Sequence, residues 1–369
     1  MTQELEFIGM VQPRQQSEIH PATGPAIDPG YLRASAQAHD VGGFDKILIG
    51  WYSNGPDGLQ LAAHAGAHTS KVGFLVAHRP GFQSPTTAAR AFNTLDQLTG
   101  GRAAIHVISG GDDTDQARDG DWLGKDARYD RTDEYVSILK QIWQAEAPVD
   151  HEGAYYRIKG ASPAVGSVQR PRIPIYFGGA SDAALRVAGK HADVYALWGE
   201  TQAQVRDIVG RVRAEAARHG REVRFSLSFR PILGDTEEAA WAKAERILGQ
   251  VRAARGGVNA MGAAGIPAQG PQNVGSQRLL DAAAKGDRPE GRLYTAIARE
   301  TGARGNTTAL VGTPEQVAEA FLEYHALGVT TFLIRGFDPL EDAAEYGRSL
   351  LPATRRLLAE RTANRIAAE

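Results

Sequence analysis

The sequence predicts an α/β fold in which eight parallel strands alternate with helices to form a (β/α)8 TIM barrel with insertions. Three observations support this class. Apolar, β-branched runs alternate with amphipathic helical segments, as in parallel βαβ units. The runs are almost continuously apolar, as expected for strands covered on both faces. The length of 369 residues fits one barrel domain over residues 1–369.

Each predicted strand is a short run rich in Val, Ile, Leu or Phe. Glycine, polar residues or a change to helical spacing follow each run. The eight predicted strands lie at residues 6–12, 46–51, 72–78, 103–109, 173–178, 193–198, 224–233 and 330–336.

Two of the intervening helices carry a clear signal for their first turn. Thr313 supplies an N-cap before Pro314, and Gln316 occupies the capping-box position. Thr201 and Gln204 repeat the box. Apolar residues then recur at helical spacing, and packing in the core explains them. They are Val317, Ala320, Phe321 and Tyr324 in one helix, and Val205, Ile208, Val209 and Val212 in the other.

Two regions interrupt the alternation of strands and helices. Residues 148–170 predict a β-hairpin and loop insertion. Residues 255–308 are rich in Gly, Ala and Gln, and they connect the seventh helix to the segment "TTALVG". We expect a lid or insertion there, because connections of this length are commonly functional or disordered.

The composition excludes several classes of function. Lys plus Arg is 41 and Asp plus Glu is 43, so no basic surface for nucleic acid is predicted. No run of about 18 apolar residues predicts a membrane span. The first ten residues lack the regions of a signal peptide, and there is no cysteine. We therefore expect a soluble cytoplasmic protein without disulfides or thiolate metal sites.

The segment "FGGASDAA" is the first candidate site. Gly178 and Gly179 end a strand, and the amides from Ala180 to Asp182 open a helix. A helix N-terminus offers unpaired N–H groups and a positive dipole end, which suit a phosphate. The spacing is not GxGxxG, so a dinucleotide is not indicated. A capped turn without any ligand fits the sequence equally well.

The segment "AIHVISGGDDTD" is the second candidate site. His106 and Ser109 end a buried strand, where a polar side chain must find a partner. The edge of a heterocycle would supply one, and so would a backbone carbonyl. The acidic run lacks the spacing and closing glutamate of a calcium loop, so no metal site is predicted.

Arginines flanked by apolar residues form the third candidate site. Arg230 and Arg335 lie near strand ends, where a buried guanidinium needs an anionic partner. That partner is either a protein carboxylate or, where several arginines converge, a bound sulfonate, carboxylate or phosphate. Arg304 in the Gly-rich lid would complete such a receptor on closure. Trp198 would supply an apolar wall, or packing beneath the next helix.

Taken together, these segments resemble the bacterial luciferase-like flavin monooxygenases, in particular the alkanesulfonate monooxygenase group. The resemblance runs from about residue 28 to residue 352. It is carried by "FLVAHRPGFQSPTTAARAFNTLDQLTGGRAAIHVISGGD", "RYDRTDEY", "PIYFGGASDAA", "VYALWGE", "ARHGREVRFSLSF", "TTALVGTPEQVAEAF" and "ALGVTTFLIRGF".

The resemblance implies a TIM barrel that binds FMN as FMNH2, supplied by a separate NAD(P)H:FMN reductase. It implies reaction with O2 to a flavin C4a-peroxide, which cleaves a small anionic organosulfonate to sulfite and an aldehyde. It also implies a homo-oligomer, either a dimer or a tetramer. The Ala77–His78 bond falls where this family often has a non-prolyl cis peptide. The flavin-binding residues implied are His78, His106, Ser109, Tyr129, Gly179, Ala180 and Ser181.

The chain departs from the alkanesulfonate pattern in the substrate region. Gly55 lies near the family's cysteine, and Ser228-Phe229-Arg230 replaces its Arg-x-His. Phe337 and Pro339 replace its tyrosine and histidine, whereas Trp198 and, shifted by one, Arg304 match. We therefore expect Arg230 and Arg335 to rebuild the anion pocket. The alternatives are a monooxygenase of a sulfone, amine or carboxylate, an F420-dependent oxidoreductase, and a non-catalytic flavin-binding protein.

Overall fold

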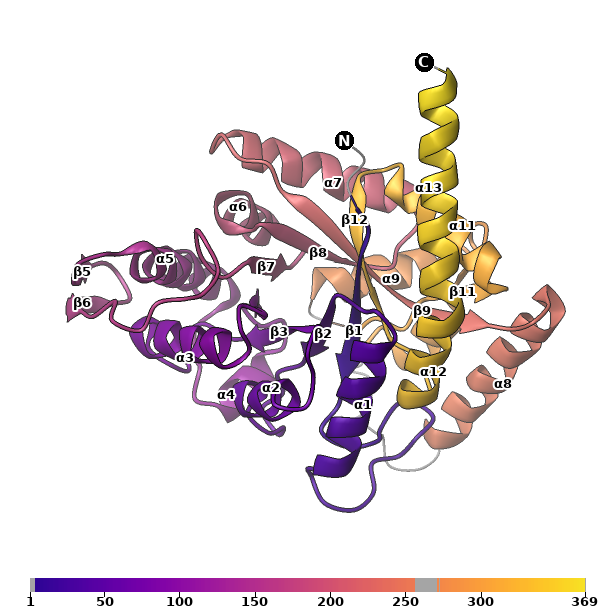
Figure 1. Ribbon diagram of the computed structural model, residues 1–369, viewed down its shortest axis with the longest axis horizontal. Coiled ribbons are helices and arrows are strands. Elements are labelled where there is room, and N and C mark those ends of the chain that lie inside the picture. Colours follow the sequence, from indigo (N-terminus) through magenta and orange to yellow (C-terminus); the bar gives the residue numbers. More distant parts are fainter. Residues whose placement is uncertain (1–3, 256–270, 272, 369) are drawn as a thin grey trace. The chain divides into compact units, whose positions relative to one another are not determined.

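The computed structural model describes residues 4–255, 271 and 273–368, and the chain has the predicted (β/α)8 barrel fold. The barrel strands carry the labels of Figure 1. They are β1 (Glu6–Val11), β2 (Lys46–Ile49), β3 (Gly73–His78), β4 (Ala103–Val107), β7 (Ile175–Gly178), β8 (Val194–Trp198), β9 (Arg224–Leu233) and β12 (Val329–Ile334).

Hydrogen bonding between the strands closes this barrel. Two short strands, β10 (Leu293–Tyr294) and β11 (Ala309–Gly312), extend the sheet beyond β9. The order is β10-β11-β9-β12-β1-β2-β3-β4-β7-β8, and β9 also pairs with β8. Within the described residues, the barrel strands therefore form a ring. Each of the eight predicted strands is confirmed, with ends shifted by at most two residues.

The chain divides into two compact units. Unit 1 comprises Met1–Ile47, Leu197–Val209 and Arg224–Glu369, and unit 2 comprises Leu48–Ala196 and Gly210–Val223. The helices of unit 1 are α1 (Pro29–Val41), α8 (Glu237–Arg255), α9 (Val274–Ala284), α10 (Ala296–Thr301), α11 (Pro314–His325), α12 (Pro339–Glu345), the π-helix η1 (Tyr346–Leu350) and α13 (Leu351–Ala368). Those of unit 2 are α2 (Gly58–Gly66), α3 (Pro85–Leu98), α4 (Asp113–Arg118), α5 (Lys125–Gln144) and α6 (Asp182–His191), and α7 (Gln202–Ala217) has residues in both.

The two predicted capping boxes are present. At α11, the Thr313 hydroxyl accepts from the Gln316 N–H at 3.3 Å, and the Gln316 side chain accepts from the Thr313 N–H at 3.0 Å. Thr201 and Gln204 make the same exchange before α7. All eight apolar residues predicted to pack in the core from these helices are buried. The first turn and the apolar stripe thus agree on where each helix begins.

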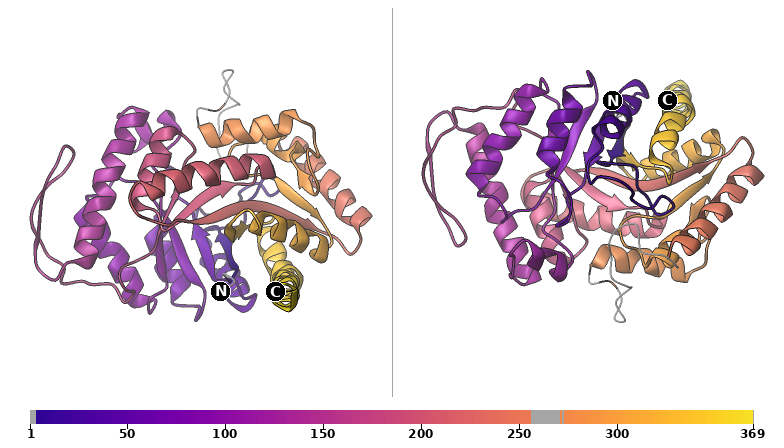
Figure 2. Two further views of the ribbon diagram at one scale, coloured as in Figure 1. Left: turned by 90° about the horizontal axis from the view of Figure 1, so that it is seen from above. Right: turned by 90° about the horizontal axis from the view of Figure 1, so that it is seen from below.

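The predicted hairpin insertion is confirmed in unit 2. Strands β5 (Val149–Glu152) and β6 (Arg157–Ala161) pair antiparallel, and Figure 2 shows this segment projecting from the helices of the unit. Glu134 on α5 anchors its turn, because its carboxylate accepts from the N–H groups of Tyr155 at 2.9 Å and Tyr156 at 2.8 Å.

The predicted lid at residues 255–308 is described only in part. Residues 256–270 and 272 lie outside the described residues. From residue 273 onward the insertion forms α9, β10 and α10. Its role as a lid stays a prediction.

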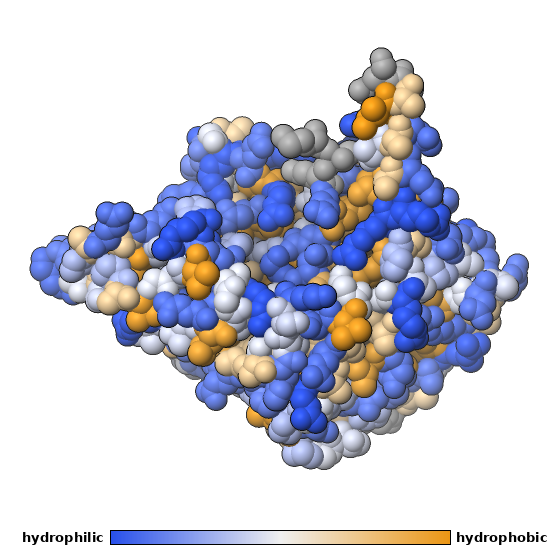
Figure 3. All heavy atoms as spheres, viewed as in Figure 1, coloured by the Kyte–Doolittle hydropathy of each residue, from blue (hydrophilic) through white to orange (hydrophobic). Residues whose placement is uncertain are grey.

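The described helices and one face of the surface show how apolar residues are distributed. None of the described helices is both long and apolar enough to cross a membrane. On the face shown in Figure 3, hydrophilic residues dominate and hydrophobic residues are scattered among them.

Candidate active site

The register of β3 and β4 in unit 2 decides which predicted side chains point into the barrel. Ala77 pairs with His106, so their side chains lie on one face of the sheet, and His78 lies on the other. The ring of His78 packs against Phe92 on α3 and Tyr135 on α5, with centroids 5.5 and 5.6 Å apart. His78 therefore faces the helices, and His106 faces the interior.

His78 already has a polar partner on the helix side. Its Nε2 lies 2.7 Å from the Tyr135 hydroxyl oxygen, and its side chain is buried. Burial lowers the pKa of His78 to about 4, so the ring is neutral at physiological pH. The Ala77–His78 peptide is trans, whereas Arg170–Pro171 is cis. A direct contact between His78 and a flavin stays a prediction.

His106 has an unused hydrogen-bonding atom. Its Nδ1 is buried, and no partner for it lies among the residues that the structure describes. Burial lowers the pKa of His106 to about 4, so this ring is also neutral. An unpaired buried polar atom costs about 1–3 kcal/mol, and a ligand atom would recover that cost. Among the predicted flavin residues on β3 and β4, His106 is the one that offers a free atom.

Ser109 lies in the loop after β4 and is held by neighbouring elements. Its hydroxyl is 2.9 Å from that of Thr132 on α5, and its carbonyl accepts from the Gln116 side chain on α4 at 3.0 Å. Gly110, with φ +86°, makes this contact possible, because a Cβ there would lie 1.3 Å from Gln116 Nε2. The acidic run after Ser109 forms α4, with Asp112 as its N-cap.

The predicted phosphate segment forms the N-terminus of α6. Ser181 is the N-cap, and its hydroxyl accepts from the Ala184 N–H at 3.3 Å. Gly179 has φ +139°, and a Cβ there would lie 2.9 Å from both the Tyr129 hydroxyl oxygen and the Ala184 Cβ. The Tyr195 hydroxyl donates to the Gly179 carbonyl. These contacts require glycine and hold the backbone of the turn in place.

Tyr129 lies next to Gly179 and Ser181. Burial raises the pKa of Tyr129, and a hydrogen bond with the Ser181 side chain opposes this shift, so the phenol keeps its proton and can donate. The Asp182 carboxylate in the first turn of α6 would repel a phosphate. It is paired with Arg211, whose Nη2 lies 2.6 Å from Asp182 Oδ1. The segment therefore suits a phosphate group.

The interior histidine adjoins this segment. A Cβ placed on Gly178 would lie 3.7 Å from the His106 ring. The unpaired nitrogen and the phosphate turn are thus close enough for one mononucleotide to contact both.

A cavity of about 370 Å³ lies elsewhere in unit 2. It is lined by Trp51, Gly81, Phe82, Asp119, Gly120, Asp121 and Arg131. Trp51 packs edge-on against His78, with ring centroids 6.1 Å apart. None of the predicted flavin residues lines this cavity.

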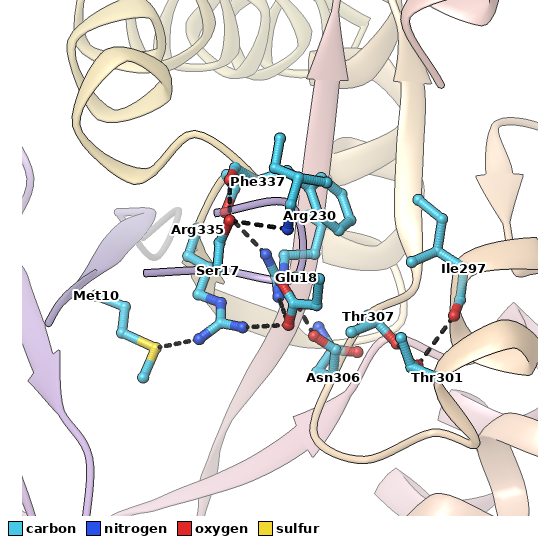
Figure 4. A network of polar contacts seen from close by, with 12 residues as sticks. Met10, Ser17, Glu18, Arg230, Ile297, Thr301, Asn306, Thr307, Arg335 and Phe337 are labelled. Carbon is cyan, nitrogen blue, oxygen red and sulfur yellow. Dashed lines mark hydrogen bonds and ion pairs between the residues drawn. The ribbon is translucent and has the colours of Figure 1, made fainter. Parts of the chain in front are cut away.

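In unit 1 the two predicted arginines converge on a carboxylate of the chain itself (Figure 4). Arg230 Nη2 and Arg335 Nη2 both donate to Oε1 of Glu18, which lies in the loop after β1, and the Arg335 contact is 2.8 Å. Of the two partners that the sequence allowed, the structure has the protein carboxylate. The expected anion pocket is therefore filled by Glu18.

Each nitrogen of the Arg230 guanidinium already donates to a group of the chain. Its Nε donates to the Asn306 carbonyl at 3.2 Å and its Nη1 to the Gly336 carbonyl at 2.8 Å. The guanidinium stacks over Phe337 at 4.4 Å, and the side chain is 1% exposed. Burial lowers the pKa of Arg230 to about 10, so it remains charged at neutral pH.

Arg335 and Glu18 are less enclosed. Arg335 Nη1 donates to Met10 Sδ at 3.3 Å, and its side chain is 15% exposed. Burial opposes ionisation of Glu18. The charges of Arg230 and Arg335 and the hydrogen bond from Arg230 nevertheless lower its pKa to about 2. Glu18 is therefore ionised at every physiological pH.

Trp198 and Arg304 lie in unit 1, and their catalytic roles stay predictions. Trp198 ends β8 and is partly exposed. The backbone of α9 packs on its indole, because a Cβ on Gly275 would lie 3.3 Å from the ring. Arg304 is partly buried in the loop after α10, next to Ala303, which has φ +50°. That conformation is uncommon outside glycine and indicates a tightly held loop.

Sequence reasoning missed two residues of this cluster. Glu18 sits in the polar run "QQSEIH", where nothing local distinguishes it. Asn306 fixes the loop, since its Nδ2 donates to the Ser228 carbonyl at 2.7 Å and hydroxyl at 3.0 Å. Only the expectation of an anionic partner for Arg230 could have prompted a search for Glu18.

Comparison with known proteins identifies relatives over almost the whole chain. The family model for luciferase-like monooxygenases matches residues 5–331. A riboflavin lyase, solved with modified FMN and riboflavin, is 21% identical with a TM-score of 0.77, covering 97% of this chain and 92% of its own. An EDTA monooxygenase from Chelativorans sp. BNC1 is 20% identical with a TM-score of 0.74, covering 96% and 94%. A coenzyme F420-dependent tetrahydromethanopterin reductase from Methanopyrus kandleri is 18% identical with a TM-score of 0.67, covering 95% and 99%. Because these sequence identities are low, the three solved structures show that this chain shares their fold, and nothing more.

Proposed function

The chain belongs to the luciferase-like monooxygenase family, and we propose that it is a two-component monooxygenase that uses FMNH2 and O2. In this proposal a separate NAD(P)H:FMN reductase supplies the reduced flavin, and the enzyme oxidises a small organic substrate.

The observation that carries the flavin assignment is the position of His106. Its unpaired Nδ1 is buried in the barrel interior, and its ring adjoins Gly178 at the start of the phosphate turn. A ligand that satisfies both must join a hydrogen-bonding heterocycle to a phosphate, as FMN does. Bound FMNH2 supplies the electrons that activate O2.

The residues of the chain hold this ligand and set its surroundings. The N-terminus of α6 and the Tyr129 hydroxyl bind the phosphate, and Gly179 keeps the turn free of a side chain. The neutral ring of His106 presents Nδ1 to the flavin without adding charge to the barrel interior. Because the ring stays neutral above about pH 5, the contribution of His106 to flavin binding is constant at physiological pH.

The substrate class is where the structure departs from the sequence-based expectation of an organosulfonate. Cleavage of a sulfonate requires a receptor for its anionic group. The two arginines expected to form one are both paired with Glu18. Of the other candidates, this pairing also disfavours a carboxylate, which is anionic, and leaves a neutral sulfone or an amine as the compound that is oxidised.

Anaerobic titration of the full chain with FMNH2, oxidised FMN and reduced F420 tests the cofactor. We expect FMNH2 to bind most tightly, followed by O2 uptake in the presence of a flavin reductase and substrate. The fold also suits F420, as the tetrahydromethanopterin reductase illustrates. Tighter binding of reduced F420 than of FMNH2 would refute the proposal. Sulfite release from a sulfonate panel would restore the organosulfonate assignment.

A further inference from the structure

Glu18 determines what kind of substrate can bind beside the two arginines. We propose that Glu18 makes this part of the barrel mouth select ligands that donate a hydrogen bond, such as ammonium, amide or hydroxyl groups, over sulfonates and other anions. The inference rests on the proposed function, because it concerns the substrate of the same enzyme.

The two carboxylate oxygens of Glu18 differ in their hydrogen bonding. Oε1 receives both Arg230 and Arg335. Oε2 is buried and has no hydrogen-bond partner within the described part of the chain. A buried carboxylate oxygen strongly favours a donor, because leaving it unpaired carries the full cost of its desolvation.

Other hydrogen-bond donors of this cluster already donate to acceptors other than Glu18. The N–H groups of Ile19 and His20 donate to Ser17 Oγ, each at 3.2 Å, and the Ser17 hydroxyl donates to the Phe337 carbonyl. Asn306 Nδ2 donates to Ser228. None of these N–H and O–H groups donates to Oε2, so a substrate N–H or O–H would supply the partner that Oε2 lacks.

The position of the positive charge in this cluster disfavours the binding of an anion. Two arginines and one carboxylate leave the cluster with a net positive charge, which by itself would attract an anion. Arg230, however, is 1% exposed and each of its nitrogens already donates to a group of the chain, so burial shields its remaining N–H groups from a ligand. An anion would have to bind through Arg335 alone while lying close to the ionised Glu18. The same carboxylate attracts an ammonium group and accepts from a neutral donor.

The position of the cluster supports contact with substrate. Glu18 lies in the loop after β1, Arg230 on β9, and Arg335 immediately after β12. In (β/α)8 barrels, the segments that follow the strands build the active site. A hydrogen-bond acceptor fixed there by two arginines has a defined orientation without any ligand, which favours selective binding.

The test uses three probes of equal carbon number: butanamide as a neutral donor, diethyl sulfone as a neutral molecule without a donor, and 1-butanesulfonate as an anion. Each is titrated into the full chain by calorimetry, without flavin. We expect butanamide to bind at least ten times more tightly than 1-butanesulfonate. In Glu18→Gln the preference should fall to threefold or less, or reverse, with diethyl sulfone affected least.

The matched control is Asp150→Asn, which removes an exposed carboxylate paired with Lys159 in the hairpin. It should leave the order of the three probes unchanged. Tighter binding of 1-butanesulfonate by the wild-type chain, an unchanged preference in Glu18→Gln, or no binding of butanamide would each overturn the inference. Should Glu18→Gln fail to fold, the wild-type order alone decides. Because no flavin is present, failure here leaves the cofactor titration unaffected.

Discussion

Replacing Glu18 with glutamine is expected to remove part of the acid sensitivity of the protein's stability. The pKa of Glu18 in the folded chain is about 2, against an ordinary value of 4.5. A lowered folded-state pKa means that the stabilisation is complete above pH 4.5 and is lost as the pH falls through 2. The folded state holds the ionised form, since its two arginines are within hydrogen-bonding distance.

The magnitude follows from the two pKa values. At about 1.36 kcal/mol per pKa unit, Glu18 contributes roughly 3 kcal/mol at pH 7. With the same two values, about 2 kcal/mol of this is lost between pH 5 and pH 3. Glutamine cannot ionise, so the Glu18→Gln protein should lose about 2 kcal/mol less than the wild type over this interval.

Urea unfolding, followed by tryptophan fluorescence at intervals from pH 5 to pH 3, measures the difference. Glu18→Gln should also be less stable than the wild type at pH 7, because the buried Arg230 and the largely buried Arg335 lose their anionic partner. Asp150→Asn, from the exposed hairpin, should follow the wild-type pH dependence. Parallel curves for the wild type and Glu18→Gln would refute the paired carboxylate.

Three further predictions concern the flavin site and the framework. Gly179→Ala should weaken FMN binding, measured by flavin fluorescence, at least tenfold, because a φ of +139° is strained for alanine and the new Cβ would lie 2.9 Å from the Tyr129 hydroxyl oxygen. The control is Gly210→Ala in α7, where the space around the glycine is open, and it should leave this affinity unchanged. His106→Leu should also weaken FMN binding, and because the pKa of His106 is about 4, the wild type and His106→Leu should show the same pH dependence of FMN affinity from pH 6 to pH 8. A change in affinity near pH 6.5 that occurs in the wild type and is absent from His106→Leu would contradict this. Thr313→Ala should lower the free energy of unfolding by about 1 kcal/mol through loss of the α11 cap, without changing flavin affinity.

The prediction from sequence was most successful where the signal is local. The capping boxes at Thr201 and Thr313 and the strand runs each depend on residues within a few positions of one another. The start of α6 at Ser181 also depends on a local signal, since the Ser181 hydroxyl accepts from the N–H of Ala184, three residues away. These features form wherever the backbone adopts the corresponding element, so the sequence suffices to place them.

The candidate flavin residues show where a linear pattern is incomplete. His78 and His106 both lie near strand ends and resemble family positions, yet they occupy opposite faces of the sheet. The pairing of Ala77 with His106 decides this, and it depends on the register between two strands. His78 consequently has Tyr135 as its partner, while His106 keeps an unpaired nitrogen.

The sequence by itself determined the succession of strands and helices, the hairpin insertion, and the glycine turn that opens α6, because periodicity and capping act between neighbours in the chain. Only the tertiary structure decided the partner of the arginines. Glu18 lies 212 residues from Arg230 and 317 from Arg335. The need of a buried guanidinium for an anion can be read from its apolar neighbours, but the identity of that anion depends on which loop the fold brings within about 3 Å of it.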